Sequence, residues 1–231
     1  MTKDKHVPIT GAGSGLGASL AIKYNKMGNH VTLIGRTREK LEKVAIEFEN
    51  SNYSIYSLDV SLPSKVKEVF AQIEKEVRPI DILINNAGLG YFDLAENITD
   101  QQIDQMIDIN LKGTIYCTQA VLPAMKERDA GSVINVISTA GVEGKFNESV
   151  YCASKFGVKG FTESIIKEVE DLNIHVHGIY MGGMNTNFWG DELQDQSDTG
   201  LMNPNDVADV IIANTVERQN MNIPKVIIKN H

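Results

Sequence analysis

The chain has 231 residues, of which 42% are hydrophobic and 23% are charged, and its formal net charge is −8. This composition is that of an ordinary globular protein, and the length fits one domain spanning 1–231 better than two. The negative charge argues against nucleic acid or an anionic membrane as a partner, because either needs a basic patch. The two cysteines have no CxxC spacing, no apolar run reaches transmembrane length, and the first residues hold no apolar signal segment, so we expect a cytoplasmic protein.

Short runs rich in Val and Ile alternate with stretches of helical periodicity along the whole chain. The predicted strands are 6–10, 31–35, 53–58, 80–85, 132–138, 175–181 and 225–228. The predicted helices lie near 15–27, 37–49, 63–77, 100–128, 151–171 and 204–218. This alternation predicts an α/β fold with a doubly wound parallel sheet, that is, a Rossmann fold of about seven strands in an αβα sandwich.

Single residues mark some of the expected boundaries. Thr99, followed three residues later by Gln102, predicts a capping box at the start of the fourth helix. Pro63 and Pro204 stand where first-turn prolines are tolerated. Pro8, in contrast, lies inside a strand that should be central, where it removes a backbone donor and should weaken the pairing or force a local irregularity.

The first predicted strand runs directly into a glycine-rich turn and then a helix, with the sequence Thr10-Gly11-Ala12-Gly13-Ser14-Gly15-Leu16-Gly17. Glycines let the backbone turn sharply and approach a pyrophosphate, whose charge the helix N-terminus attracts. An ordinary βα turn also uses glycine. The place of this glycine-rich turn in the first βα unit nevertheless favours a dinucleotide site.

The end of the second predicted strand bears on which dinucleotide binds. An NAD site usually has a carboxylate there for the ribose 2′-hydroxyl, whereas this chain has Gly35, Arg36 and Thr37. Arginine pairs well with a 2′-phosphate, so the sequence favours NADP(H), with NAD(H) as the alternative. The simpler interpretation of Arg36 is a solvated loop cation.

Tyr151 and Lys155 are four residues apart on a predicted helix and therefore share a face, and Ser138 ends the preceding strand. Hydride transfer to a carbonyl requires a proton donor, and the reverse reaction requires a base. A neighbouring ammonium and an oxidised nicotinamide should lower the tyrosine pKa from about 10. Each residue alone has an ordinary explanation, but together beside a dinucleotide loop they predict carbonyl and alcohol chemistry.

With this glycine spacing, Asn85-Asn86-Ala87-Gly88 after the fourth strand and Tyr151-Cys152-Ala153-Ser154-Lys155, the chain resembles the short-chain dehydrogenase/reductase family from Lys5 to about Val216. The resemblance implies an NAD(P)(H)-dependent oxidoreductase. The implied catalytic residues are Asn110, Ser138, Tyr151 and Lys155. The implied cofactor contacts are Gly11, Ser14, Gly15, Leu16, Gly17, Arg36, Thr37, Asp59, Val60, Asn86, Ala87, Gly88, Tyr151, Lys155, Gly182 and Thr186.

The resemblance also implies individual roles. Asp59 would contact the adenine, Thr186 would hold the nicotinamide carboxamide, and Lys155 would bind the nicotinamide ribose. Asn110 would hold a water that connects Lys155 to solvent. Gly182 follows Met181, where the family usually has Pro-Gly.

The remaining expectations concern substrate, assembly and alternatives. A polar substrate loop at about 187–203, with Phe188 and Trp189 near its start, should face a small carbonyl or alcohol compound. Helices 100–128 and 151–171 resemble the family's dimer-forming pair, which favours a homodimer, with a tetramer as the alternative.

His175 and His177 lack a third ligand at a suitable spacing, so no metal site is predicted. A catalytically silent dinucleotide-sensing protein is the alternative function, although it has no need for a proton-transfer set. An extended sugar-nucleotide epimerase would need a larger C-terminal domain.

Overall fold

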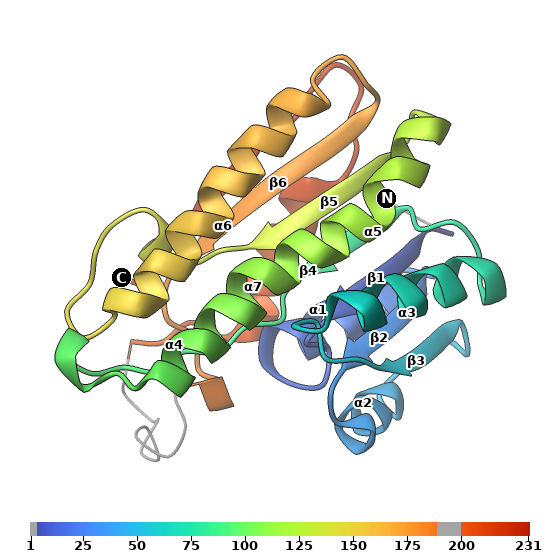
Figure 1. Ribbon diagram of the computed structural model, residues 1–231. Coiled ribbons are helices and arrows are strands. Elements are labelled where there is room, and N and C mark those ends of the chain that lie inside the picture. Colours follow the sequence, from blue (N-terminus) through green and yellow to red (C-terminus); the bar gives the residue numbers. More distant parts are fainter. Residues whose placement is uncertain (1–3, 189–199) are drawn as a thin grey trace.

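The computed structural model describes residues 4–188 and 200–231, which form three layers, helices on both sides of one sheet (Figure 1). The sheet has seven strands in the order β3-β2-β1-β4-β5-β6-β7, and every neighbouring pair is parallel. The strands are β1 His6–Thr10, β2 His30–Gly35, β3 Tyr53–Ser57, β4 Ile82–Asn85, β5 Gly131–Val136, β6 Ile174–Met181 and β7 Lys225–Ile228. The predicted doubly wound fold is therefore confirmed, with strand ends within two residues of most expected positions.

The pairing of the central strand β1 is uneven on its two sides. It pairs with β2 through all five of its residues, but with β4 only through Ile9 and Ile84. On that weaker side the amide of His6 donates to the carboxylate of Asp81 at 2.7 Å instead of to a strand carbonyl. The irregularity expected from Pro8 is thus present, because proline has no N–H to donate to a neighbouring strand.

The helices cover both faces of the sheet. They are α1 Gly15–Lys26, α2 Arg38–Ala45, α3 Pro63–Glu76, α4 Asp100–Met106, α5 Gly113–Arg128, α6 Ser149–Glu168 and α7 Pro204–Thr215. Helices α3, α5 and α6 lie on the face nearer the viewer in Figure 1, and α1 and α7 lie behind the sheet. Each layer buries an apolar face against the strands, which is what a doubly covered parallel sheet requires.

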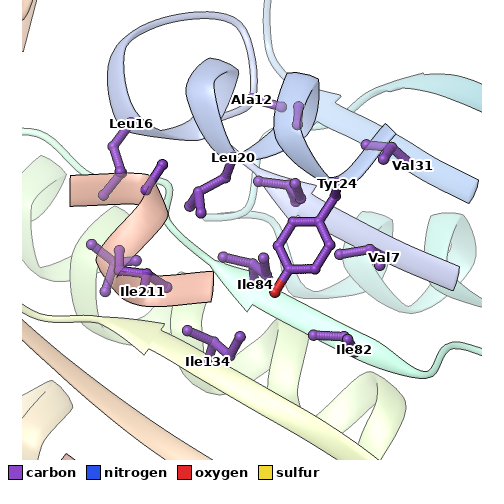
Figure 2. Close-up of a cluster of buried hydrophobic side chains, with 14 of the residues drawn as sticks. Val7, Ala12, Leu16, Leu20, Tyr24, Val31, Ile82, Ile84, Ile134 and Ile211 are labelled. Atoms are coloured by element: carbon purple, nitrogen blue, oxygen red, sulfur yellow. The ribbon is translucent and has the colours of Figure 1, made fainter. Parts of the chain in front are cut away.

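The core on the α1 and α7 side is built of aliphatic side chains around one tyrosine. Leu20, Tyr24 and Ile211 point from the two helices toward strand residues such as Ile84 and Ile134 (Figure 2). Tyr24 is 2% exposed, and this burial raises its pKa to about 12. The tight packing between α1 and the sheet holds the glycine-rich turn that precedes the helix in place.

The opposite layer contains a short buried polar chain between β4, β5 and the two helices that cover them. The side chain of Asn85 donates to Thr118 at 3.0 Å and to Asn135 at 2.9 Å, and Asn135 donates to Thr162 at 2.9 Å. Buried amides need such partners, since an unpaired one costs about 1–3 kcal/mol. This series of hydrogen bonds thus fixes α5 and α6 relative to the carboxyl ends of the central strands.

The prediction of one continuous α-helix over 100–128 is wrong at residues 107–112. Helix α4 and helix α5 are separated by a π-helical segment, η2 Ile107–Lys112, in which each hydrogen bond spans an extra residue. The predicted capping box at the start of α4 is confirmed, because Gln102 N donates to Thr99 Oγ1 at 3.3 Å and Thr99 N donates to Gln102 Oε1 at 2.9 Å. Within residues 4–188 and 200–231, no helix is long and apolar enough to cross a membrane.

Candidate active site

A cavity of about 820 Å3 opens at the carboxyl ends of the strands, between the glycine-rich turn and the start of α6. This is the edge where open α/β sheets bind their ligands. Of the predicted cofactor and catalytic residues, those that line it are Gly11, Ser14, Gly15, Leu16, Arg36, Asn86, Ala87, Gly88, Ser138, Tyr151, Lys155, Gly182 and Thr186. Residues from distant parts of the chain therefore meet around one space.

The backbone of the glycine-rich turn needs the absence of side chains. Gly11 and Gly15 have φ of +66° and +53°, a region that L side chains rarely adopt. A Cβ on Gly17 would collide with the Gly11 carbonyl oxygen and lie 2.6 Å from Asn86 Nδ2. Helix α1 begins at Gly15, so its first N–H groups lie at the cavity wall. The cradle therefore fits a diphosphate group, as a dinucleotide carries.

Asn86 holds this turn against the end of β4. Its Nδ2 lies 3.0 Å from the carbonyl oxygen of Thr10 and 3.3 Å from that of Gly11. The Thr10 hydroxyl in turn accepts from the amides of Asn86 and Ala87, both at 3.0 Å. These bonds make Asn86 a brace for the turn in addition to a lining residue.

Two cations lie where the cavity passes the end of β2. Arg36 lines the cavity, as does Lys40, which the sequence analysis missed. Lys40 lies in the first turn of α2, and no periodicity links it to Arg36, because Arg36 precedes the helix. No Asp or Glu of the described chain lines this end of the cavity.

Four of the predicted cofactor residues, Gly17, Thr37, Asp59 and Val60, are not among the lining residues. The Asp59 carboxylate accepts from the amide and the hydroxyl of Ser61 at 3.0 and 2.7 Å. Thr37 is the N-cap residue of α2. Asp59 thus stabilises a turn, and Thr37 begins a helix. The predicted adenine contact of Asp59 stays a prediction.

Tyr151, Lys155 and Ser138 come together at the other end of the cavity. Tyr151 and Lys155 lie on the first two turns of α6 and are 6% and 4% exposed. The Lys155 ammonium lies 5.7 Å from the centre of the Tyr151 ring and donates to the Val136 carbonyl at 3.2 Å. Ser138 follows β5, lines the cavity with Tyr151, and its side chain lowers the pKa of Tyr151. The predicted proton-transfer set is thus assembled in one buried place.

The backbone at Ser138 is strained. Its φ of +115° lies in a region that residues with a Cβ rarely adopt, at a cost of about 1–3 kcal/mol. The Ser138 Oγ accepts from the Ala140 amide at 3.2 Å, at the start of the short segment η3 Thr139–Gly141. Because this bond uses a lone pair, the hydroxyl proton of Ser138 remains available to a substrate oxygen.

The expectation that Lys155 lowers the pKa of Tyr151 is wrong for this structure. Burial raises the pKa of Tyr151 above that of free tyrosine, the Ser138 hydrogen bond opposes this only in part, and Glu148 raises it further. Burial likewise lowers the pKa of Lys155 to about 8. The physical reason is that loss of hydration disfavours both charged forms and outweighs their mutual attraction at this separation.

Asn110 lies in the π-helical segment and is 1% exposed. Its side chain accepts from the Leu89 amide at 2.9 Å and donates to the Leu89 carbonyl at 2.8 Å and to Ser154 at 3.0 Å. Ser154 donates to the Tyr151 carbonyl at 2.7 Å. Asn110 therefore ties the turn after β4 to the helix that carries Tyr151, and its predicted water contact stays a prediction.

Phe92, Lys145 and Glu148 line the cavity near Tyr151 and were not singled out from the sequence. The rings of Phe92 and Phe188 each lie 5.7 Å from the Tyr151 ring, centre to centre. Two charged residues, Lys145 and Glu148, line the same end. Phe188 was expected near the entrance, whereas Trp189 and most of the predicted substrate loop at about 187–203 lie outside the described residues.

A family model described as short chain dehydrogenase matches residues 5–197. The chain belongs to the short-chain dehydrogenase family. A Staphylococcus aureus protein described as an uncharacterised oxidoreductase is 32% identical over 229 residues, covering 98% of this chain and 97% of the relative. A sepiapterin reductase of Chlorobaculum tepidum is 28% identical over 235 residues, covering 97% and 96%.

The solved structures include a serine dehydrogenase in its closed form with NADP+. It is 31% identical to this short-chain dehydrogenase, covers 96% of this chain and 93% of its own, and superposes with a TM-score of 0.90. The chain thus spans nearly the full length of these relatives. As a member of an oxidoreductase family, it carries the family's fold with the glycine-rich turn and the tyrosine–lysine pair in one cavity.

Proposed function

We propose that this protein is an NADP(H)-dependent oxidoreductase that interconverts an alcohol and a carbonyl compound, with Tyr151 as the acid and base. The observation that carries the proposal is the meeting of Tyr151, Ser138 and Lys155 with the glycine-rich turn around a single cavity. A sensor that only bound the dinucleotide would gain nothing from a strained serine and a buried lysine beside a buried tyrosine.

The bound nicotinamide cofactor would supply or accept the hydride at the substrate carbon. In reduction, Tyr151 donates its phenolic proton to the oxygen that becomes the alcohol, and in oxidation it takes that proton back. Burial keeps Tyr151 in its neutral form, which is the form that a proton donor needs. Ser138 donates its hydroxyl proton to the same substrate oxygen and orients it toward Tyr151.

Lys155 and Asn110 have supporting roles in this proposal. Lys155 would hold the nicotinamide ribose, since its ammonium faces the cavity beside Tyr151. Asn110 positions the turn after β4, through its two bonds to Leu89, so that this wall keeps its shape. Gly88 lies between them, because a Cβ there would be 3.2 Å from Asn110 Oδ1 and 3.5 Å from Lys155 Nζ.

The preference for NADP(H) rests on the pair of cations at the end of β2. Arg36 and Lys40 present two positive charges where an NAD-preferring site presents a carboxylate. The solved serine dehydrogenase carries NADP+, which supports the same choice. NAD(H) is the alternative cofactor.

The choice is tested by Arg36→Ala, with Arg38→Ala as the matched control. Arg38 is exposed and pairs with Glu42, and it does not line the cavity. We expect Arg36→Ala to weaken NADPH binding about 10- to 100-fold, as loss of a charge-assisted bond does, and to leave NADH binding nearly unchanged. Equal losses for both cofactors, measured by fluorescence titration, would remove the preference.

Catalysis is tested by Tyr151→Phe, which removes only the hydroxyl. We expect kcat to fall about 10²- to 10⁴-fold for oxidation of NADPH with a panel of aldehydes, ketones and quinones. Tyr56→Phe is the control, because Tyr56 bonds to Glu76 away from the cavity. Cofactor binding without turnover of any carbonyl or alcohol would favour the sensing protein instead.

We infer a homodimer formed through α5 and α6, with a tetramer as the alternative. Phe156 on α6 is 43% exposed, so this helix presents a large apolar side chain that a second subunit could cover. Phe156→Asp should lower the molar mass in analytical ultracentrifugation to that of a monomer. An unchanged molar mass would contradict a dimer contact through Phe156.

The two cysteines, Cys117 and Cys152, are free thiols, which supports a reducing cytoplasmic location.

The names of two relatives give different substrates, serine and sepiapterin, for one fold. Neither name decides the substrate of this chain, because short-chain dehydrogenases vary the walls of the cavity while keeping the proton-transfer set. The residues that face the substrate therefore determine which compound binds.

A further inference from the structure

Two side chains of opposite charge line the end of the cavity that holds Tyr151, and the proposed proton transfer uses neither of them. Lys145 and Glu148 belong to the loop between η3 and α6, and both line the cavity together with Ser138 and Tyr151. The apolar part of the wall near Tyr151 includes the rings of Phe92 and Phe188. Partly buried charges are costly, so a ligand that pairs with them gains more than it would at an open surface.

Lys145 is held next to the reacting groups. Its Nζ donates to the hydroxyl of Thr139 at 2.8 Å, and Thr139 directly follows Ser138. Thr139 is 7% exposed, so it anchors the long lysine side chain at the inner wall. An ammonium has three donors, and no carboxylate of the described chain lies within ion-pair distance of this one.

Glu148 lies one helical turn before Tyr151. Partial burial raises the pKa of its carboxyl group, the charge of Lys145 opposes this, and Glu148 itself raises the pKa of Tyr151. The carboxylate is therefore within electrostatic reach of both Lys145 and the reacting phenol. Within residues 4–188 and 200–231 its oxygens have no hydrogen-bond donor and form no ion pair, not even with Lys145.

The two charges are close in the chain but do not neutralise each other. The Glu148 amide donates to the Lys145 carbonyl at 3.3 Å, so the two residues begin and end one tight turn. The two side chains leave opposite ends of this turn, and both reach the wall of the cavity. A small ligand that carries a negative and a positive charge can pair with both residues at once.

We propose that the substrate is a zwitterionic hydroxy compound of the hydroxy-amino-acid class, whose carboxylate binds Lys145 and whose ammonium binds Glu148. This inference rests on the proposed function. An apolar alcohol would leave both charges without partners, and a compound with only one charge would satisfy one residue and be repelled by the other. In oxidation the substrate carbinol loses a hydride to the oxidised cofactor and its hydroxyl proton to the phenolate form of Tyr151, and becomes a carbonyl.

Four secondary alcohols of one skeleton test the proposal with NADP+ as the oxidant. L-threonine carries both charges, 3-hydroxybutanoate only the carboxylate, 1-amino-2-propanol only the ammonium, and 2-butanol neither; both enantiomers of the last three are used. We expect kcat/KM, followed by the absorbance of reduced cofactor, to be highest for L-threonine by about 10-fold or more over each of the others. Equal or higher values for 2-butanol would overturn the proposal.

Three variants then assign the charges. Lys145→Met should raise KM about 10-fold or more for L-threonine and 3-hydroxybutanoate and lower kcat/KM for 2-butanol far less, and Lys145→Arg should restore most of the loss. Glu148→Gln should raise KM for L-threonine and 1-amino-2-propanol but not for 3-hydroxybutanoate. Losses that are the same for charged and uncharged alcohols would mean that these residues only support the fold, and the proposal would be wrong.

The same panel separates this inference from the proposed function. Turnover of 2-butanol or of uncharged ketones that depends on Tyr151, without any preference for L-threonine, leaves the oxidoreductase in place and refutes the zwitterionic substrate. Absence of turnover for every alcohol and carbonyl compound, with NADP(H) still bound, refutes both.

Discussion

The buried ammonium of Lys155 should make the stability of the protein depend on pH in a defined way. Burial lowers the pKa of this group from 10.5 to about 8 in the folded protein. Between these pH values the unfolded chain binds more protons than the folded one, so the free energy of unfolding rises with pH across that range. The cost is fully present below about pH 8 and is relieved above about pH 10.5. Over the whole range it amounts to about 3 kcal/mol.

Lys155→Met isolates this contribution, because methionine has a similar length and cannot titrate. Between about pH 7 and pH 9.5, the wild type should gain about 2 kcal/mol of unfolding free energy relative to the variant. Urea denaturation followed by circular dichroism at several pH values measures the difference, and tyrosine and cysteine ionisation cancels in it. At neutral pH the variant should be the more stable and the less active protein.

The control is Lys167→Met on the last turn of the same helix. Lys167 is 77% exposed and pairs with Glu170. Its replacement should change the unfolding free energy by less than about 0.5 kcal/mol at every pH. A flat difference between wild type and Lys155→Met across this pH range would refute the reasoning, because it would mean that the ammonium is hydrated in the folded protein.

Three further variants test separate parts of the structure. Gly17→Ala places a methyl group against the Gly11 carbonyl and Asn86 and should weaken NADP(H) binding by about 10-fold or more, whereas Gly160→Ala, with open space at its Cβ, should leave binding unchanged in the same titration. Asn110→Ala leaves the Leu89 backbone without its partners and should lower the free energy of unfolding by about 2–3 kcal/mol, which a lower melting temperature would show. It should also lower kcat. Thr99→Ala removes the capping box and should cost about 1 kcal/mol without altering kcat/KM, so a loss of activity there would contradict the assignment of Thr99 to the fold alone.

Much of the fold could be predicted from the sequence because apolar periodicity and glycine placement act locally. The alternation of strands and helices, the turn at Gly11 and the first-turn positions of Pro63 and Pro204 all follow from the chain itself. The π-helical segment could not be predicted, because the residues of 107–112 suit an α-helix and only tertiary contacts select the wider turn. The amide at Asn110, with its bonds to Leu89 far away in the chain, is such a contact.

In the site, too, some features follow from the sequence and others depend on tertiary contacts. The meeting of Ser138, Tyr151 and Lys155 follows from the rule that parallel strands end at one edge of the sheet. The pKa values of the last two do not, because they depend on how completely the surrounding side chains exclude water. The places of Lys145 and Glu148 were equally out of reach, since a loop between two elements has no period to orient its side chains.

The charges of the cavity differ in sign from those of the molecule that surrounds it. The formal net charge of the chain is −8, yet the described charged residues that line the cavity are Arg36, Lys40, Lys145 and Lys155 against the single carboxylate of Glu148. An anion that diffuses toward the protein is thus repelled at most of the surface and attracted only near the opening. Added salt screens both effects, over about 8 Å at physiological ionic strength, so it speeds the approach from afar and slows the final capture. The encounter rate with an anionic dinucleotide should therefore change little with salt, while its residence time shortens.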